Sequence, residues 1–352
     1  MNIEAVKNSS EKKKTGLFIE WINSIKDRFL KLYDLEIQEK HIELPPIDIR
    51  IHFGAHGTRE DAMNFEKELE EADVYFPESL GWDTAELVAF KKFTEGKMSQ
   101  ETLERFMAKV TPREYVGVGF EKQLFKMLYQ TRKPVAFIDL PEGHPIQKEL
   151  KFLKFNNFSE KSKSFEELLD SMKDYAKKVA ELQLKREEYM QSQIVPQLER
   201  LCAENPELAK KKTIRILMSL GSAHTTLYHV LKKEGQPVTR SFPDDPYVQS
   251  LFNELVRRYE LGKPVNDEIV AGTFLESWLS GLLFDKGFSI SKTATTRFIR
   301  DIALKFSVND IKDLLDPKSF KLPPDFKNKI LQQLKEKNIE LPSSQEELDK
   351  LY

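Results

Sequence analysis

The chain has 352 residues and nearly balanced charge, with 55 lysines and arginines against 57 aspartates and glutamates. This balance excludes the strong one-signed field that binds nucleic acid or an anionic membrane surface. The single cysteine, Cys202, excludes a disulfide framework and a thiolate metal cage within the chain. The polar, basic N-terminus lacks the apolar core of a secretory signal, and no apolar run reaches the length of a membrane span. We therefore expect a cytoplasmic protein without a nucleic-acid partner or a membrane span.

The pattern of apolar residues divides the chain into three parts. Residues 1–45 comprise a polar tail, expected to be disordered, and a helix whose apolar residues recur at helical spacing over residues 17–35. Residues 46–244 alternate strand-like and helix-like segments, which predicts an α/β core with a long helical insertion at about 164–204. Residues 245–352 are expected to be helical.

The first predicted strand ends in a tight turn that carries a histidine. Apolar and polar residues alternate from Ile47 to Phe53, which is the period of a half-buried strand. Gly54 and Gly57 then bracket His56, so that the backbone can turn sharply before a helix begins. The imidazole is therefore expected at the carboxyl end of the strand, where ligands bind in open α/β sheets.

Two further predicted strands carry carboxylates at their ends. A short apolar strand, Asp73–Phe76, is followed by Glu78, and the third strand, Lys133–Leu140, holds Asp139 before a loop rich in proline and glycine. Taken alone, a residue such as Glu78 is more often a solvated strand end, and Asp139 more often caps the following turn.

A long helix opened by a capping box is predicted over Ser164–Leu201. Its apolar stripe includes Leu182 and Met190, and Arg186 lies inside the stripe, four residues from each. A guanidinium that faces a core costs several kcal/mol unless it is paired. Either the helix rotates and leaves Arg186 in solvent, or Arg186 reaches acidic groups at the ends of the strands, which is our prediction. Pro196 is expected to kink or end this helix.

The fourth predicted strand repeats the pattern of the first. An apolar run, Thr213–Leu220, leads through Gly221 to His224, where a helix should start, and a short edge strand follows at residues 237–242. The positive end of a helix lowers the pKa of an imidazole and favours its neutral, ligating form. His52, His144 and His229 are expected to have structural roles.

Four side chains follow the ends of predicted parallel strands, namely His56, Glu78, Asp139 and His224. Because helical connections favour parallel and adjacent strands, these side chains are expected along one rim of the sheet. Two histidines and a carboxylate resemble a hydrolytic zinc site with an open position for water. The same set without a metal supplies a histidine base oriented by a carboxylate. We therefore predict that His56, Glu78 and His224 are the catalytic residues and, if a metal is bound, its ligands.

Charged residues around this rim are candidates for binding a substrate. Arg186 and Asp139 are expected to orient or hold substrate groups, and Arg59 and Glu60 follow the His56 turn directly, although those two can equally form a surface pair. No Walker loop, G-x-G-x-x-G, H-E-x-x-H or G-x-S-x-G motif occurs, which disfavours nucleotide-binding proteins, zincins and serine hydrolases.

At these residues the chain resembles the superfamily of Tiki and TraB proteins, erythromycin esterases and ChaN-like haem-binding proteins. Its members share a Gly–His turn, a glutamate after the second strand, an acidic third strand end and a late G-x-x-H, which match Gly54-Ala55-His56, Glu78, Asp139 and Gly221-Ser222-Ala223-His224. Many members also carry an arginine, an acidic or amide residue and a methionine on the preceding helix, which match Arg186, Glu187 and Met190. The resemblance covers about residues 47–242. The first turn is one residue tighter than the usual G-x-x-H, and the glutamate that esterase-like members hold before the first histidine is absent.

This resemblance implies a hydrolase that activates water with a His/Glu/His site, with or without a divalent ion such as zinc or manganese, on a small-molecule or peptide substrate. The alternatives are a non-enzymatic binding protein for haem or another small molecule, and a degenerate member that acts through its helical surface. The expected fold is α/β, with a mainly parallel central sheet of about five strands flanked by helices and followed by a helical C-terminal region. The sequence leaves the oligomeric state open.

Overall fold

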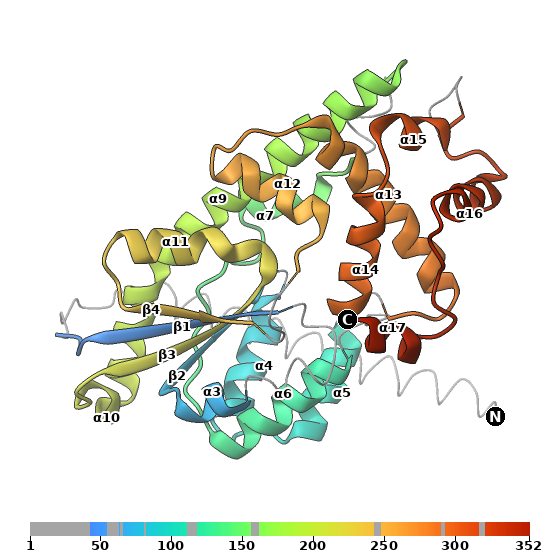
Figure 1. Cartoon of the computed structure of the whole chain (residues 1–352). Coiled ribbons are helices and arrows are strands. Elements are labelled where there is room, and N and C mark those ends of the chain that lie inside the picture. Colours follow the sequence, from blue (N-terminus) through green and yellow to red (C-terminus); the bar gives the residue numbers. More distant parts are fainter. Residues whose placement is uncertain are drawn as a thin grey trace, which may run out of the picture.

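Figure 1 shows a computed structural model of the chain, which describes residues 43–352 except for 55–62, 64–65, 81, 111–117, 156–161, 243–247, 290–292 and 317–320. The predicted N-terminal tail and the helix over residues 17–35 lie outside the described residues. The same holds for His56, Arg59 and Glu60, three of the residues predicted at the rim.

Four parallel strands form the sheet, which confirms the α/β class. In sequence they are β1 (Ile47–Gly54), β2 (Val74–Pro77), β3 (Ile214–Gly221) and β4 (Val238–Ser241), and their order across the sheet is β2-β3-β1-β4. In the register, Gly54 lies beside Gly221, and Pro77 lies beside Ser219. The carboxyl ends of β1, β2 and β3 are therefore level, so that the residues that follow them meet at one edge.

The expected fifth strand is absent from the described residues, and the prediction of about five strands is wrong by one. The segment predicted as the third strand makes a single parallel bridge, Tyr75 to Val135, at the β2 edge of the sheet. The amide of Tyr75 donates to Pro134 O at 2.9 Å, and the amide of Ala136 donates to Tyr75 O at 3.2 Å. These two bonds are the backbone hydrogen bonds between this segment and β2 among the described residues, so the segment runs beside β2 at Tyr75 and does not extend the ladder.

One face of the sheet is covered by α9 (Phe165–Glu204) and α11 (Thr225–Lys233). Apolar side chains that alternate along β1 and β3 point to this face, among them Ile49, Ile51, Ile216 and Met218. They pack against Met190, Ile194 and Leu198 of α9, which are part of the apolar stripe seen in the sequence. The burial of this stripe turns the same side of α9 toward the carboxyl ends of the strands.

The opposite face carries a second core. Helices α3 (Glu66–Glu71), α4 (Thr84–Thr94), α5 (Gln100–Val110) and α6 (Val118–Thr131) lie below the sheet in Figure 1. Tyr75 and Leu217 of the strands pack there against a group of phenylalanines that includes Phe90, Phe93 and Phe125. Trp82 also packs against this core and contacts Phe90 with ring centroids 5.1 Å apart.

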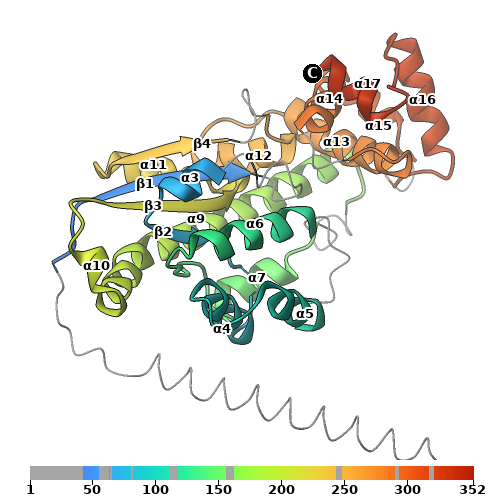
Figure 2. The same ribbon diagram turned by 90° about the horizontal axis from the view of Figure 1, so that it is seen from below.

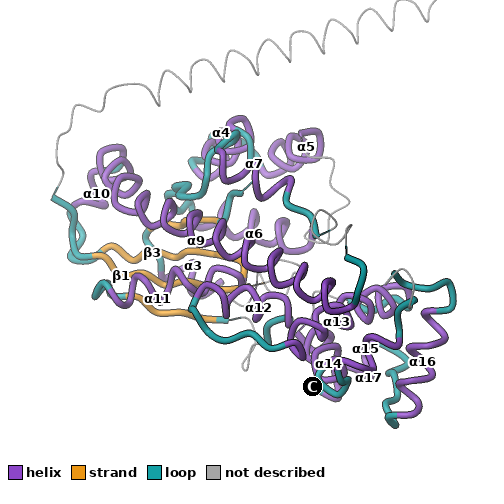
Figure 3. The backbone as a smooth tube through the Cα atoms, turned by 90° about the horizontal axis from the view of Figure 1, so that it is seen from above, coloured by secondary structure: helices purple, strands orange, loops and turns teal. Residues whose placement is uncertain are grey.

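Helix α9 is a 40-residue helix that continues through Pro196, so this proline does not end the helix, and the alternative expectation of a kink stays a prediction. Ser164 caps its start by accepting a hydrogen bond from the amide of Glu167 at 3.1 Å. Figure 3 shows α9 running along the sheet and on toward α12 (Leu251–Glu260) and α13 (Asp267–Asp285). The short helix α7 (Pro145–Phe152) packs against the middle of α9, where Glu149 pairs with Lys178, and α10 (Pro206–Ala209) follows the C-terminal end of α9.

The C-terminal residues form a helical region beside the sheet, as predicted (Figure 2). After α12 and α13 follow α14 (Thr293–Ala303), α15 (Val308–Asp313), α16 (Phe326–Glu336) and α17 (Gln345–Leu351). Their apolar residues share one core with the first turns of α9, from Phe165 to Ala180. Over the described residues, no helix combines the length and apolar character needed to cross a membrane.

Candidate functional site

A buried arginine lies at the centre of the candidate site. Arg186 is 4% exposed, and its Nε and Nη2 donate to the two carboxylate oxygens of Asp139 at 2.8 and 2.6 Å. Nη2 also donates to Glu78 Oε1 at 2.9 Å. The prediction that Arg186 pairs with carboxylates at the strand ends is therefore confirmed. The ion pairs offset the cost of holding a guanidinium on the apolar side of α9.

Asp139 is held rigidly from both sides. Its carboxylate accepts hydrogen bonds from the amides of Leu140 at 2.8 Å and Ser79 at 3.3 Å, in addition to Arg186. The side chain has no exposed surface. In this arrangement the Asp139 carboxylate positions Arg186, and a direct role of Asp139 in binding a substrate stays a prediction. Arg186 likewise uses its Nε and Nη2 groups within the protein rather than on a substrate anion.

Glu78 joins the ends of β2 and β3. Its backbone amide donates to Ser219 O at 2.9 Å, and its Oε2 accepts a hydrogen bond from the amide of Gly221 at 2.6 Å. A Cβ atom added at Gly221 would lie 3.1 Å from this same Oε2. Glycine therefore allows the close approach that lets the backbone hold the Glu78 carboxylate.

His224 lies against Glu78 from the other side. It ends the 3-10 turn η1 (Ser222–His224), and only 1% of it is exposed. Nε2 lies 3.3 Å from Glu78 Oε1, and Nδ1 lies 3.3 Å from Glu187 Oε1. Burial and the Arg186 charge both disfavour protonation, but Glu78 and Glu187 outweigh them and raise the pKa of His224 to about 9. The expectation that the start of α11 lowers this pKa is therefore wrong, because the two carboxylates outweigh the dipole of α11.

An imidazolium donates from both nitrogens and needs two acceptors. Glu78 and Glu187 supply them. The side-chain nitrogen of Gln183 lies 2.7 Å from Nδ1 and suits neutral His224. For a charged His224, the oxygen and the nitrogen of the Gln183 carboxamide must exchange places, because both nitrogens of an imidazolium are donors. We call Glu78, Asp139, Gln183, Arg186, Glu187 and His224 the rim cluster.

Sequence reasoning missed the roles of Gln183 and Glu187. Both are buried on α9, and Glu187 Oε2 has no hydrogen-bond partner within the described part of the chain. Gln183 and Glu187 are four residues apart, with Arg186 between them, and this spacing was the available signal. Glu260 of α12 was also missed. Burial, and then the charge of Glu187, raise the pKa of Glu260 to about 7, although Thr226 donates a hydrogen bond to it at 2.7 Å.

The described residues of this site do not fit a metal ion as they are arranged. No group of three histidine, cysteine, aspartate or glutamate side chains with the geometry for a metal occurs among the described residues. Both nitrogens of His224 are already paired, and Glu78 accepts from Arg186 and Gly221. A metal-bound form depends on His56, which lies outside the described residues, and so it stays a prediction.

Two other histidines have the structural roles that the sequence predicts. His144 caps α7, where its Nδ1 accepts a hydrogen bond from the amide of Ile146 at 3.2 Å. His52 is buried on β1, with Nδ1 3.0 Å from Ser241 Oγ and 3.3 Å from Glu68 Oε2. Neither histidine is among the residues of the rim cluster.

Comparisons with protein-family models, with curated proteins and with solved structures find no match to the chain.

Replacement of Arg186 by lysine should destabilise the protein by about 1–3 kcal/mol. An ammonium keeps the charge but lacks the planar set of N–H groups with which the guanidinium binds Asp139 and Glu78 at the same time. Urea unfolding followed by circular dichroism measures this loss. Arg105, exposed on α5 and paired with Glu101, provides the matched control, and Arg105→Lys should cost less than about 0.5 kcal/mol. Equal unfolding midpoints for Arg186→Lys and the wild type would contradict the pairing.

The stability of the protein should fall as the pH rises from about 6.5 to about 9. The pKa of His224 is about 9 in the folded state against an ordinary value of 6.5, so the folded state binds the extra proton. Its stabilisation is complete below pH 6.5 and is lost as the pH passes 9, with a total of about 3 kcal/mol. Thermal melts across this range measure the effect. His224→Gln should abolish this part of the pH dependence, and His229→Gln, on the following helix α11, should retain it.

Proposed function

We propose that the rim cluster is a hydrolytic centre in which Glu78 activates a water molecule. The observation that carries this proposal is the difference in exposure between its charged members. The side chain of Glu78 is 25% exposed, whereas those of Arg186, His224 and Asp139 are 5%, 1% and 0% exposed. A substrate or a water molecule can therefore reach Glu78, while the buried side chains of Arg186 and His224 bind its carboxylate from the protein interior.

In the proposed reaction, Glu78 takes a proton from a water molecule as the water oxygen attacks the carbonyl carbon of an ester or amide. The bond to the leaving group then breaks, and Glu78 returns the proton to the leaving oxygen or nitrogen. Arg186 and the His224 imidazolium fix the carboxylate in one orientation. Asp139 positions Arg186. The resemblance to erythromycin esterases and Tiki proteins supports this reaction class, and a small molecule or a peptide is the proposed substrate.

The positive partners of Glu78 have a second consequence for this mechanism. They stabilise the ionised carboxylate, which keeps it ready to accept a proton but weakens it as a base. The His224 imidazolium adds to this weakening, since its Nε2 lies 3.3 Å from Glu78 Oε1, but the same proton holds the carboxylate in the orientation that the reaction needs. Activity should therefore depend on the protonation of His224 as well as on Glu78.

Replacement of Glu78 by glutamine should reduce ester hydrolysis by about 10²–10⁴-fold, because the amide cannot accept the proton. A series of p-nitrophenyl esters with acyl chains of increasing length provides a colour readout. The control is Glu207→Gln, since Glu207 is exposed on α10 and pairs with a surface lysine, Lys210. The rate of the wild type should also fall as the pH rises through about 9, where His224 loses its proton.

Hydrolysis by Glu78→Gln at the rate of the wild type would refute the proposed role of Glu78. A wild-type protein that hydrolyses none of the esters but shifts the absorbance of added haemin would favour the binding-protein alternative. Thermal melts of both variants distinguish a lost reaction from a lost fold.

A further inference from the structure

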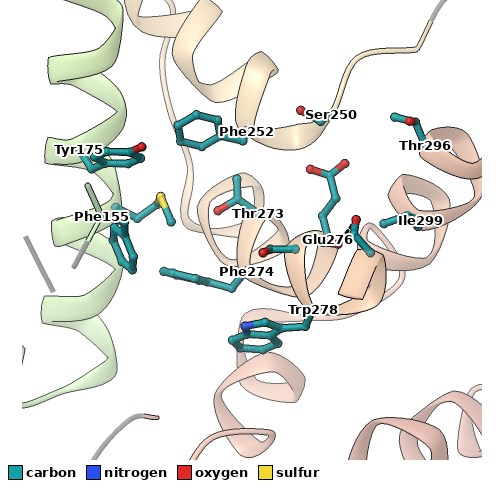
Figure 4. Close-up of a pocket in the computed structure, with 13 residues that line it drawn as sticks. Phe155, Tyr175, Ser250, Phe252, Thr273, Phe274, Glu276, Trp278, Thr296 and Ile299 are labelled. Atoms are coloured by element: carbon teal, nitrogen blue, oxygen red, sulfur yellow. Dashed lines mark hydrogen bonds between the residues drawn. The ribbon is translucent and has the colours of Figure 1, made fainter. Parts of the chain in front are cut away.

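A second site lies in the C-terminal helical region, apart from the residues of the rim cluster. A cavity of about 520 Å³ opens between α9, α12, α13 and α14 (Figure 4). None of the residues that line it belongs to the rim cluster. Its volume falls within the range of cavities that hold small molecules in proteins, and its walls are mostly apolar with a few polar groups, as in such sites.

One side of this cavity is built from aromatic rings. Figure 4 places four of the rings on one side, with Trp278 below them. Neighbouring rings contact each other in an unbroken series, with centroid separations of 5.5–6.1 Å along the path Phe252, Tyr175, Phe155, Phe274 and Trp278. Because these contacts fix the rings, the aromatic wall is ordered before a ligand arrives.

The other side of the cavity is polar and carries one charge. Ser250, Thr296 and Glu276 face the cavity opposite the rings, with Ile299 beside them (Figure 4). Of the thirteen described residues that line the cavity, Glu276 alone is charged. It is 7% exposed, so its charge acts in surroundings where electrostatic attraction is strong.

Glu276 has a structural partner but retains acceptor capacity. Its Oε1 and Oε2 both accept from the amide of Leu251, at 3.0 and 2.8 Å, at the start of α12. A carboxylate offers about four acceptor positions, so these bonds leave room for a further donor. The neighbouring cation Arg300 is engaged elsewhere, because it pairs with Glu254 and donates to Gln249 O at 2.8 Å. Burial raises the pKa of Glu276, which a bound cation would oppose.

We propose that this cavity binds an amphipathic amine, with its apolar body against the five rings and its ammonium group at Glu276 and the neighbouring hydroxyl groups. The faces of aromatic rings attract cations as well as apolar groups, so both ends of the cavity suit such a ligand. An anionic ligand would face Glu276 without any cation in the lining, and a neutral ligand would gain nothing from the charge of Glu276. This site is independent of the hydrolytic role proposed for Glu78.

The test compares three probes that share one apolar body. Phenylbutylamine, phenylbutanol and phenylbutyrate carry a cationic, a neutral and an anionic head, and isothermal titration calorimetry with the full chain measures their affinities. The amine should bind about tenfold more tightly than the alcohol, since a charge-assisted hydrogen bond in a buried site contributes about this factor. Phenylbutyrate should bind most weakly.

Two variants separate the two ends of the proposed site. Glu276→Gln should remove the preference for the amine and leave the alcohol binding as before, whereas Glu336→Gln, on the exposed face of α16, should change neither. Phe155→Ala should weaken the amine and the alcohol alike, with their ratio kept. An amine that binds no more tightly than the alcohol, a preference that survives Glu276→Gln, or failure of all three probes to bind would each overturn the proposal.

Discussion

The ion pairs of Arg186 are the interaction on which the site depends. They join three segments that are far apart in the sequence, because Arg186 belongs to α9, Glu78 follows β2, and Asp139 follows the segment that bridges to β2. A buried guanidinium is costly to desolvate, and its cost is offset only when the surrounding acceptors are held in place. Here the backbone holds them, since amides of Ser79, Leu140 and Gly221 bind the two carboxylates.

The same network explains the charge state of His224. Glu78 lies between two cations, Arg186 and the imidazolium, and Glu187 binds the far side of the imidazole. Any change that moves Glu78 therefore changes both the orientation of Arg186 and the proton affinity of His224. We infer that the rim cluster acts as a unit, and that single substitutions within it will not have additive effects.

The C-terminal helical region makes hydrogen bonds to the residues on both sides of His224. Gln249, just before α12, donates a hydrogen bond to Ser222 O at 3.3 Å, and Thr226 of α11 donates to Glu260 at the end of α12 at 2.7 Å. Helix α9 also belongs to both cores, through Phe165–Ala180 at one end and Met190–Cys202 at the other. The helical region therefore has a structural role at the rim in addition to the cavity that it contains.

Much of this arrangement was predictable from the sequence, for identifiable reasons. Alternation in β1 and the apolar run of β3 fixed the strands, and the charge of Arg186 within an apolar stripe predicted its acidic partners. The prediction of a fifth strand was wrong because apolar content alone does not show whether a segment stays beside its neighbour for more than one residue. The proton on His224 could not be foreseen, because it depends on Glu187, whose approach to the imidazole results from tertiary packing. Glu260 gave no local signal at all.

A double-mutant cycle between Arg186 and Asp139 tests the central claim most directly. The free energies of unfolding are measured for Arg186→Met, Asp139→Leu and the double variant. We expect each single substitution to cost about 3–5 kcal/mol, because it leaves a buried charge without its partner. The double variant should cost at least about 2 kcal/mol less than the sum of the two. Strictly additive costs would show that the two residues do not interact in the folded protein, and would contradict this account of the site.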